Sequence, residues 1–170
     1  MDLGYRHLET DVHATADGVL LAFHDAALDR VTSRKGRLQD LQYVDVAAAL
    51  IADREQIPTL QVLLEHFPDA YFNIDIKSEA AVQPLTRLLE ATGTETRVCV
   101  ASFSQRRIAT FRRDSRGRVL TAASPLEVAA VRFAAGLPRA GLPRAGHPGP
   151  LQVPGRFRGI PVATPAFIAE

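Results

Sequence analysis

Acidic residues alternate along one short segment near the start of the sequence. Glu9, Asp11 and His13 are separated by single residues, so an extended backbone would place all three side chains on one face. Two carboxylates held side by side repel each other and lose hydration when they are covered. A hard divalent cation such as Mg²⁺ or Ca²⁺ removes that penalty. The alternative is an exposed edge strand, and these residues alone do not decide between the two.

A second acidic position lies within the apolar segment 71–77. Asp75 and Lys77 share one face of the strand predicted there. In a parallel barrel the C-terminal strand ends meet at one rim, so these two side chains would converge there with Glu9 and Asp11 around a cation and an anionic substrate. Three carboxylates suit Mg²⁺ or Ca²⁺ better than Zn²⁺. The alternative for Asp75 and Lys77 is a local ion pair.

His24 and Asp25 directly follow the apolar segment Val19–Phe23. A histidine at a strand end can act as general acid or base near neutral pH. A His-Asp pair of this kind can equally be structural. His13 is ambiguous, since it can support a ligand or end the strand, and the remaining histidines are given no role.

Apolar segments with strand character alternate with helical patterns, as is typical of βαβ units around a parallel sheet. Strands are predicted at Arg6–Val12, Val19–Phe23, Tyr71–Ile76, Arg97–Ala101, Val119–Thr121 and Leu151–Val153, with a further one at Ile160–Ala163. Helices are predicted at Val44–Ala52, Thr59–His66, Ala80–Thr92, Ser104–Arg113 and Pro125–Ala134. A turn at Thr15–Gly18 joins the first two strands like a hairpin, because Gly18 can take a positive φ.

The length of 170 residues favours a single domain over residues 1–170, with a packed core. The Gly- and Pro-rich segment 136–150, in which GLPRA occurs twice, is expected to be an extended surface loop of that domain. The single cysteine, Cys99, excludes an intrachain disulfide. No apolar stretch approaches the roughly 18 residues of a membrane span, and a cytoplasmic location is expected.

The formal net charge of +1 conceals an uneven distribution, because acidic residues predominate up to residue 96 and arginines after it. The arginines between residues 106 and 118 could follow the phosphates of a nucleic acid. No aromatic residues alternate with them to stack on bases, so solvated faces of one helix and its following turn are favoured. No nucleic-acid partner is expected, and the oligomeric state stays open.

The segments ETDVHATADGVLLAFHDAALDRVT and FNIDIK, in this order and spacing, resemble the core signature of glycerophosphodiester phosphodiesterases. IPTL and VASFSQRR are also similar, so the resemblance covers nearly all of the chain. It implies an α/β fold, an incomplete TIM-type (β/α) barrel of the kind found in PLC-like phosphodiesterases. It also implies metal-dependent hydrolysis of a small or lipid-derived glycerophosphodiester to glycerol 3-phosphate and an alcohol, in lipid metabolism.

By motif, Glu9 and Asp11 match the family's Glu-x-Asp metal strand, and Asp75 stands where the family commonly has a Glu ligand. Lys77 matches the substrate-contacting lysine of the second motif. His24 matches the second catalytic histidine. The cofactor that the resemblance implies is Mg²⁺ or Ca²⁺.

Three family features have no counterpart in this sequence: the first strand with His-Arg-Gly, the nearby Glu-Asn pair, and the final strand with its tryptophan. We therefore expect a central barrel fragment with little or no activity on its own. Two alternatives remain. One is a non-catalytic barrel module that binds a metal or a partner through open edges. The other is an intramolecular transphosphorylase similar to the phospholipase D toxins, which form a cyclic phosphate.

Overall fold

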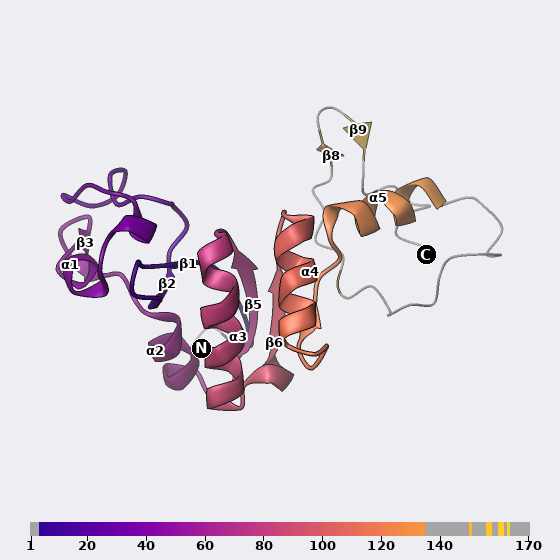
Figure 1. The fold of residues 1–170 in the computed structure, drawn as a ribbon, viewed down its shortest axis with the longest axis horizontal. Coiled ribbons are helices and arrows are strands. Elements are labelled where there is room, and N and C mark those ends of the chain that lie inside the picture. The colour runs from indigo at the N-terminus through magenta and orange to yellow at the C-terminus, as the bar shows by residue number, and fades with distance from the viewer. Residues whose placement is uncertain (1–3, 135–149, 151–155, 158–159, 162, 164–170) are drawn as a thin grey trace.

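The apolar segments form one five-stranded sheet in the computed structural model, which describes residues 4–134, 150, 156–157, 160–161 and 163. The strand order is β2-β1-β5-β6-β7, in which β1, β5, β6 and β7 run parallel and β2 is antiparallel to β1 (Figure 1). The strands are β1 His7–Ala14, β2 Leu20–Ala22, β5 Tyr71–Ile76, β6 Val98–Ala101 and β7 Leu120–Thr121. Within the described ranges the sheet does not close into a barrel.

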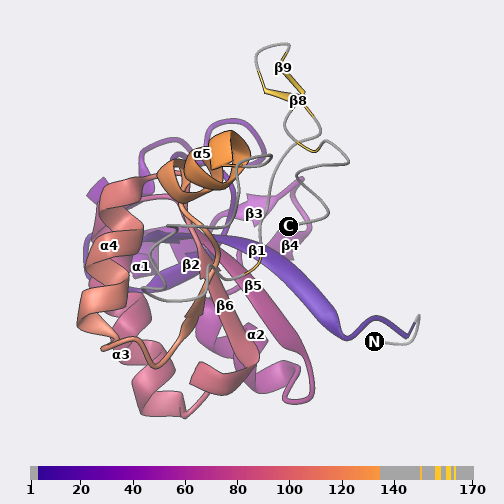
Figure 2. The same ribbon diagram turned by 90° about the vertical axis from the view of Figure 1, so that its right-hand side faces the viewer.

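Helices α3 and α4 lie on one side of this sheet, as Figure 2 shows. The helices are α1 Tyr43–Ala47, α2 Leu60–His66, α3 Val82–Thr92, α4 Gln105–Asp114 and α5 Pro125–Ala134. Two small hairpins pair β3 Leu50–Ile51 with β4 Glu55–Gln56 and β8 Arg156–Phe157 with β9 Ile160–Pro161. The side chains of Thr59 and Ser104 cap α2 and α4 by accepting backbone N–H groups of the first turn.

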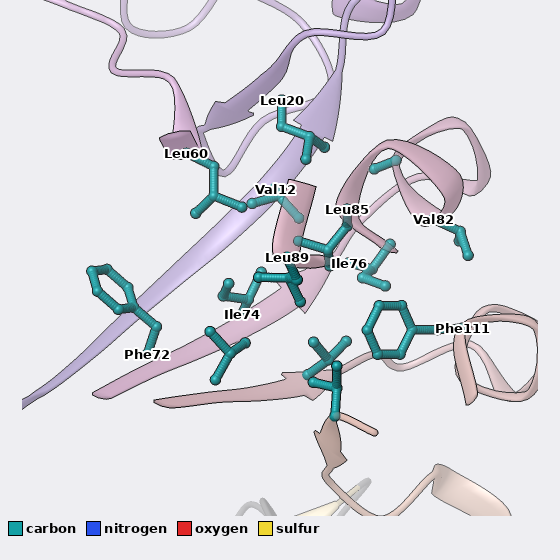
Figure 3. Close-up of a cluster of buried hydrophobic side chains, with 14 of the residues drawn as sticks. Val12, Leu20, Leu60, Phe72, Ile74, Ile76, Val82, Leu85, Leu89 and Phe111 are labelled. Atoms are coloured by element: carbon teal, nitrogen blue, oxygen red, sulfur yellow. The ribbon is translucent and has the colours of Figure 1, made fainter. Parts of the chain in front are cut away.

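The main core fills the space between the sheet and α2, α3 and α4 (Figure 3). Val12 and Ile74 from the sheet pack there with Leu85 and Leu89 of α3 and Phe111 of α4, and all five are fully buried. Because successive side chains of a strand point to opposite faces, the residues between the core positions point away from the helices. We call this opposite side of the sheet the polar face.

A second core lies under the long connection between β2 and α2. It consists of Leu21, Phe23, Leu28, Leu38, Val46, Ala49 and Ile57. Backbone hydrogen bonds from Leu28 to Gly36 O (3.0 Å) and from Leu38 to Ala26 O (3.0 Å) close the loop that follows β2. This loop is therefore anchored by its own apolar contacts and not by the main core.

Most of the predicted elements are present with ends shifted by one or two residues, and the hairpin turn has Gly18 at φ 82° as expected. The helix predicted over Val44–Ala52 is too long, since α1 ends at Ala47. That segment forms α1 and then β3, because Ala52 and Asp53 adopt φ of 49° and 58° and turn the chain back into β4. The predicted strand Leu151–Val153 and residues 136–149 of the predicted loop lie outside the described residues.

Arg97 ties the end of α2 to the start of β5. Its guanidinium donates to the carbonyl oxygens of Leu64 (2.6 Å), Phe67 (3.1 Å) and Ala70 (3.1 Å), and it lies 5.5 Å from the centre of the Phe72 ring. Carbonyl groups at a helix end have no hydrogen-bond partner within the helix. The Arg97 side chain supplies the donors for three such groups at the end of α2 and in the loop after it.

Replacing Arg97 with Met is expected to destabilise the protein by about 2–3 kcal/mol, because three carbonyls lose a charged donor. Urea unfolding measures the change. Arg87→Met, at an exposed position of α3, is the matched control and is expected to stay within about 0.5 kcal/mol. Equal effects of the two substitutions would contradict the role given to Arg97.

Arg112 and Glu127 join α4 to α5 through two hydrogen bonds, from Nη1 to Oε1 (2.6 Å) and from Nη2 to Oε2 (3.0 Å). Arg112 also donates to the hydroxyl of Thr121. These hydrogen bonds from Arg112 lower the pKa of Glu127 from its ordinary 4.5 to about 2. The ionised carboxylate is therefore the form that the folded protein favours.

The ion pair between Arg112 and Glu127 is expected to make the free energy of unfolding depend on pH in the acidic range. A lowered carboxyl pKa contributes stability above pH 4.5, and this contribution is lost as the pH falls toward about 2. Both side chains are about one-third exposed, so screening keeps the contribution below about 1 kcal/mol. Urea unfolding as a function of pH should show the gap between wild type and Glu127→Gln closing in this window. A gap that is constant with pH argues against the pair.

Candidate functional site

Two carboxylates meet on the polar face of the sheet. Asp11 of β1 and Asp75 of β5 are directly paired in the parallel register. The ammonium of Lys77 lies between them, with Nζ at 2.9 Å from Asp11 Oδ1 and 2.6 Å from Asp75 Oδ2. All three side chains are largely covered, with 24% of Lys77 and 9% of Asp75 exposed. The lysine thus compensates two acids that repel each other.

Lys77 does not satisfy the whole of Asp75. The Oδ1 atom of Asp75 is buried and has no hydrogen-bond partner among the residues that the structure describes, which is costly for a carboxylate oxygen. An additional donor or a hard cation next to this atom would remove that cost. The donor set of Asp11 and Asp75 therefore fits a divalent cation, with oxygen ligands of the kind that Mg²⁺ and Ca²⁺ prefer.

Glu9 lies on the same face as Asp11 but one alternation further from the rim, opposite Asn73. Its side chain is exposed, and its pKa is raised first by partial loss of hydration and then by repulsion from Asp11. In the described residues no three His, Cys, Asp or Glu side chains stand close enough together to enclose a metal. The structure thus brings Asp11, Asp75 and Lys77 into contact and leaves Glu9 beside them.

His24 lies beside the site, but not because it follows the C-terminal end of a parallel strand, as the sequence predicted. Because β2 is antiparallel to β1, its end points away from the rim of the parallel strands. The backbone N–H of Phe23 donates to Asp11 O (2.9 Å), so His24 follows immediately beside the site. Its ring Nδ1 lies 2.7 Å from Asp25 Oδ1, and 71% of its side chain is exposed.

His13, whose role the sequence left open, supports the main chain of His24. Its buried ring has Nε2 at 3.2 Å from His24 O. A carbonyl oxygen only accepts, so Nε2 carries the hydrogen. Burial lowers the pKa of His13, and the ring is therefore neutral with Nδ1 unprotonated.

Two neighbours of the site were missed by the sequence reasoning. Arg30 binds the carboxylate of Asp25, and the ring of Phe103, 74% exposed, lies with its centre 5.6 Å from Lys77 Nζ. Phe103 lies two residues after the end of β6, so its place near a strand end was a usable signal. Nothing in the sequence indicated that the loop after His24 would fold Arg30 back onto Asp25.

The fold and this arrangement define an α/β protein with carboxylates and a lysine clustered on one face of a mostly parallel sheet. Residues 1–146 match the model of the glycerophosphoryl diester phosphodiesterase family. The chain belongs to this family.

One curated relative agrees with this assignment, and two solved structures have a similar fold. A probable glycerophosphodiester phosphodiesterase 2 of Mycobacterium tuberculosis is 37% identical over 168 residues, which are 98% of this chain and 64% of the relative. A solved glycerophosphoryl diester phosphodiesterase domain, also from Mycobacterium tuberculosis, has a TM-score of 0.72 at 19% identity and covers 84% of this chain and 57% of that chain. A phosphodiesterase of Oleispira antarctica, solved in complex with sn-glycerol-3-phosphate, has a TM-score of 0.61 at 18% identity. The match covers 72% of this chain and 55% of that chain.

The structural neighbours establish the fold. They are TIM-barrel-like proteins, which confirms the predicted incomplete TIM-type barrel. The chain spans less than two thirds of the length of each of these relatives. Enzymes of this family generally depend on a divalent metal. Among the residues that the structure describes, no helix has both the length and the apolar character needed to cross a bilayer.

Replacing Lys77 with Met is expected to destabilise the protein by roughly 2–4 kcal/mol in buffer without divalent cations, because Asp11 and Asp75 then face each other uncompensated. Thermal or urea unfolding gives the value. Adding Asp75→Asn to Lys77→Met should recover part of the loss, since one of the two charges is gone. Lys35→Met, at an exposed position, is the control and should be neutral. A neutral Lys77→Met would show that solvent already screens the two acids.

Proposed function

We propose that this chain supplies the metal-binding carboxylates, the phosphate-binding lysine and one histidine of a phosphodiester hydrolase that converts glycerophosphodiesters of lipid metabolism to glycerol 3-phosphate and an alcohol. The observation that carries the proposal is the pairing of the buried Asp75 with Asp11 around Lys77, with Asp75 Oδ1 left without a partner in the described part of the chain. Family membership supports the reaction class, and the product bound to the Oleispira antarctica phosphodiesterase supports the product.

The carboxylates of Asp11 and Asp75, with Glu9 on the same face, would hold Mg²⁺ or Ca²⁺. When bound, such an ion polarises the phosphate and offsets the charge that develops on it. The ammonium of Lys77, which lies between the two acids, would be the group that binds a phosphate oxygen. The imidazole of His24 is exposed beside Asp11 and can accept or donate the proton that hydrolysis requires.

Divalent cations are the first test of this proposal. Calorimetric titration with Mg²⁺ and with Ca²⁺ should give binding that is lost in Asp11→Ala, because one of the two adjoining carboxylates is then absent. Asp69→Ala, an exposed acid in the loop before β5, is the control and should bind as wild type. Unchanged affinity in Asp11→Ala would place the cation elsewhere.

Product formation is the second test. Release of glycerol 3-phosphate from glycerophosphocholine should require the divalent cation. The ratio between the rates of the variants is the quantity of interest. His24→Ala should lower the rate by about 10²–10⁴, whereas His66→Ala, at an exposed position of α2, should not.

The same assay separates the alternatives when the products are examined by phosphorus NMR. Hydrolysis gives a phosphomonoester, whereas an intramolecular transphosphorylase gives a cyclic phosphate. A chain that binds cations but forms neither product in the presence of either cation would instead favour a non-catalytic module.

A further inference from the structure

His24, Asp25 and Arg30 form a chain of hydrogen bonds at the edge of the site. The Nδ1 atom of His24 lies 2.7 Å from Asp25 Oδ1. Arg30 donates to both oxygens of the same carboxylate, from Nε to Oδ2 at 2.5 Å and from Nη2 to Oδ1 at 3.0 Å. Such a two-pronged contact fixes the plane of a carboxylate as well as its charge.

The chemistry of the carboxylate determines which nitrogen of His24 carries the hydrogen. Hydrogen bonds from Arg30 and then from His24 lower the pKa of Asp25 to about 2, so the group is ionised near neutral pH and can only accept. Nδ1 of a neutral His24 must then be the donor, and the lone pair of Nε2 is left free. Without such a partner, the imidazole of histidine in water favours the opposite tautomer, with hydrogen on Nε2.

We propose that Asp25 and Arg30 are positioning residues for His24: Asp25 selects the tautomer with a free Nε2, and Arg30 holds the carboxylate in the plane that makes this bond. The inference rests on the function proposed for His24 and adds the groups that prepare its ring for proton transfer. The hydrogen bond on one ring nitrogen sets the state of the other, which is the nitrogen available to a substrate.

The surrounding loop is built to keep these groups in place. Only 18% of the Asp25 side chain is exposed, against 71% for His24 and 67% for Arg30, so the acid is the most covered of the three. Leu28, between Asp25 and Arg30 in the sequence, is buried in the second core and anchors the loop. An exposed imidazole without such a partner would be free to rotate, and its orientation would have to be restricted at each encounter with substrate.

The tautomer can be measured on the chain without substrate or metal. Long-range ¹H–¹⁵N correlation spectra of the ¹⁵N-labelled chain report which ring nitrogen of each histidine is protonated. The measurement is made about two units above the ordinary histidine pKa of about 6.5, where the rings are neutral. His24 is expected to be protonated at Nδ1. His13 is the internal reference and is expected at Nε2, because that atom donates to His24 O.

Substitutions then test each positioning residue. Asp25→Ala should move His24 to a mixture in which Nε2–H predominates. Arg30→Met should raise the Nε2–H fraction of His24 by a smaller amount. Arg34→Met, at an exposed position of the same loop, should leave the wild-type tautomer. An unchanged His13 signal shows in each variant that the strand beneath is intact, and if Asp25→Ala does not fold, Arg30→Met decides.

The proposal is overturned if wild-type His24 carries its hydrogen on Nε2, or if Arg30→Met and wild type give the same tautomer ratio. These outcomes are independent of catalysis. A chain whose affinity for Mg²⁺ and Ca²⁺ is unchanged in Asp11→Ala but whose His24 is protonated at Nδ1 contradicts the proposed function and leaves the positioning intact. A chain that releases glycerol 3-phosphate but has His24 protonated at Nε2 supports the proposed function and overturns the positioning.

Discussion

The repulsion between Asp11 and Asp75 is the unfavourable interaction that the rest of the structure has to offset. Parallel pairing of β1 and β5 puts the two acids opposite each other, and Lys77 compensates them from the residue just beyond β5. That register is held from the other side of the sheet, where Val12 and Ile74 are packed against helices. A slip of one residue would bury the acids in the core, so apolar packing enforces an electrostatically unfavourable arrangement.

The sequence predicted what depends on alternation and not what depends on loops. Period two along two strands was enough to place Asp11, Asp75 and Lys77 on one face, because the strand backbone leaves no other choice. The helix expected over residues 44–52 was too long, because the chain leaves the helix after Ala47 and turns back at Ala52 and Asp53, where φ is positive. The contact of Arg30 with Asp25 depends on the path of an irregular loop, for which neighbouring residue types give no rule.

The site is built from two groups of residues, which come from strands that run in opposite directions. The parallel strands supply acids and a lysine, which act as fixed charges and need to be close together. The antiparallel β2 delivers His24 from the opposite direction, past the side of Asp11, so the group that would move a proton comes from a separate connection. A protein built only of parallel units would have to bring such a histidine from the end of another parallel strand.

The two cores have a consequence for motion. The main core holds the sheet with Asp11 and Asp75, whereas the second core holds the connection that carries Asp25 and Arg30. The contacts that link them include a ladder of three residue pairs between β1 and β2 and the hydrogen bond from Ala22 N to Pro58 O. Cooperative units of this kind can open separately. Amide hydrogens in residues 26–38 should therefore exchange with solvent through partial opening events, while those of β5 exchange only when the whole domain unfolds.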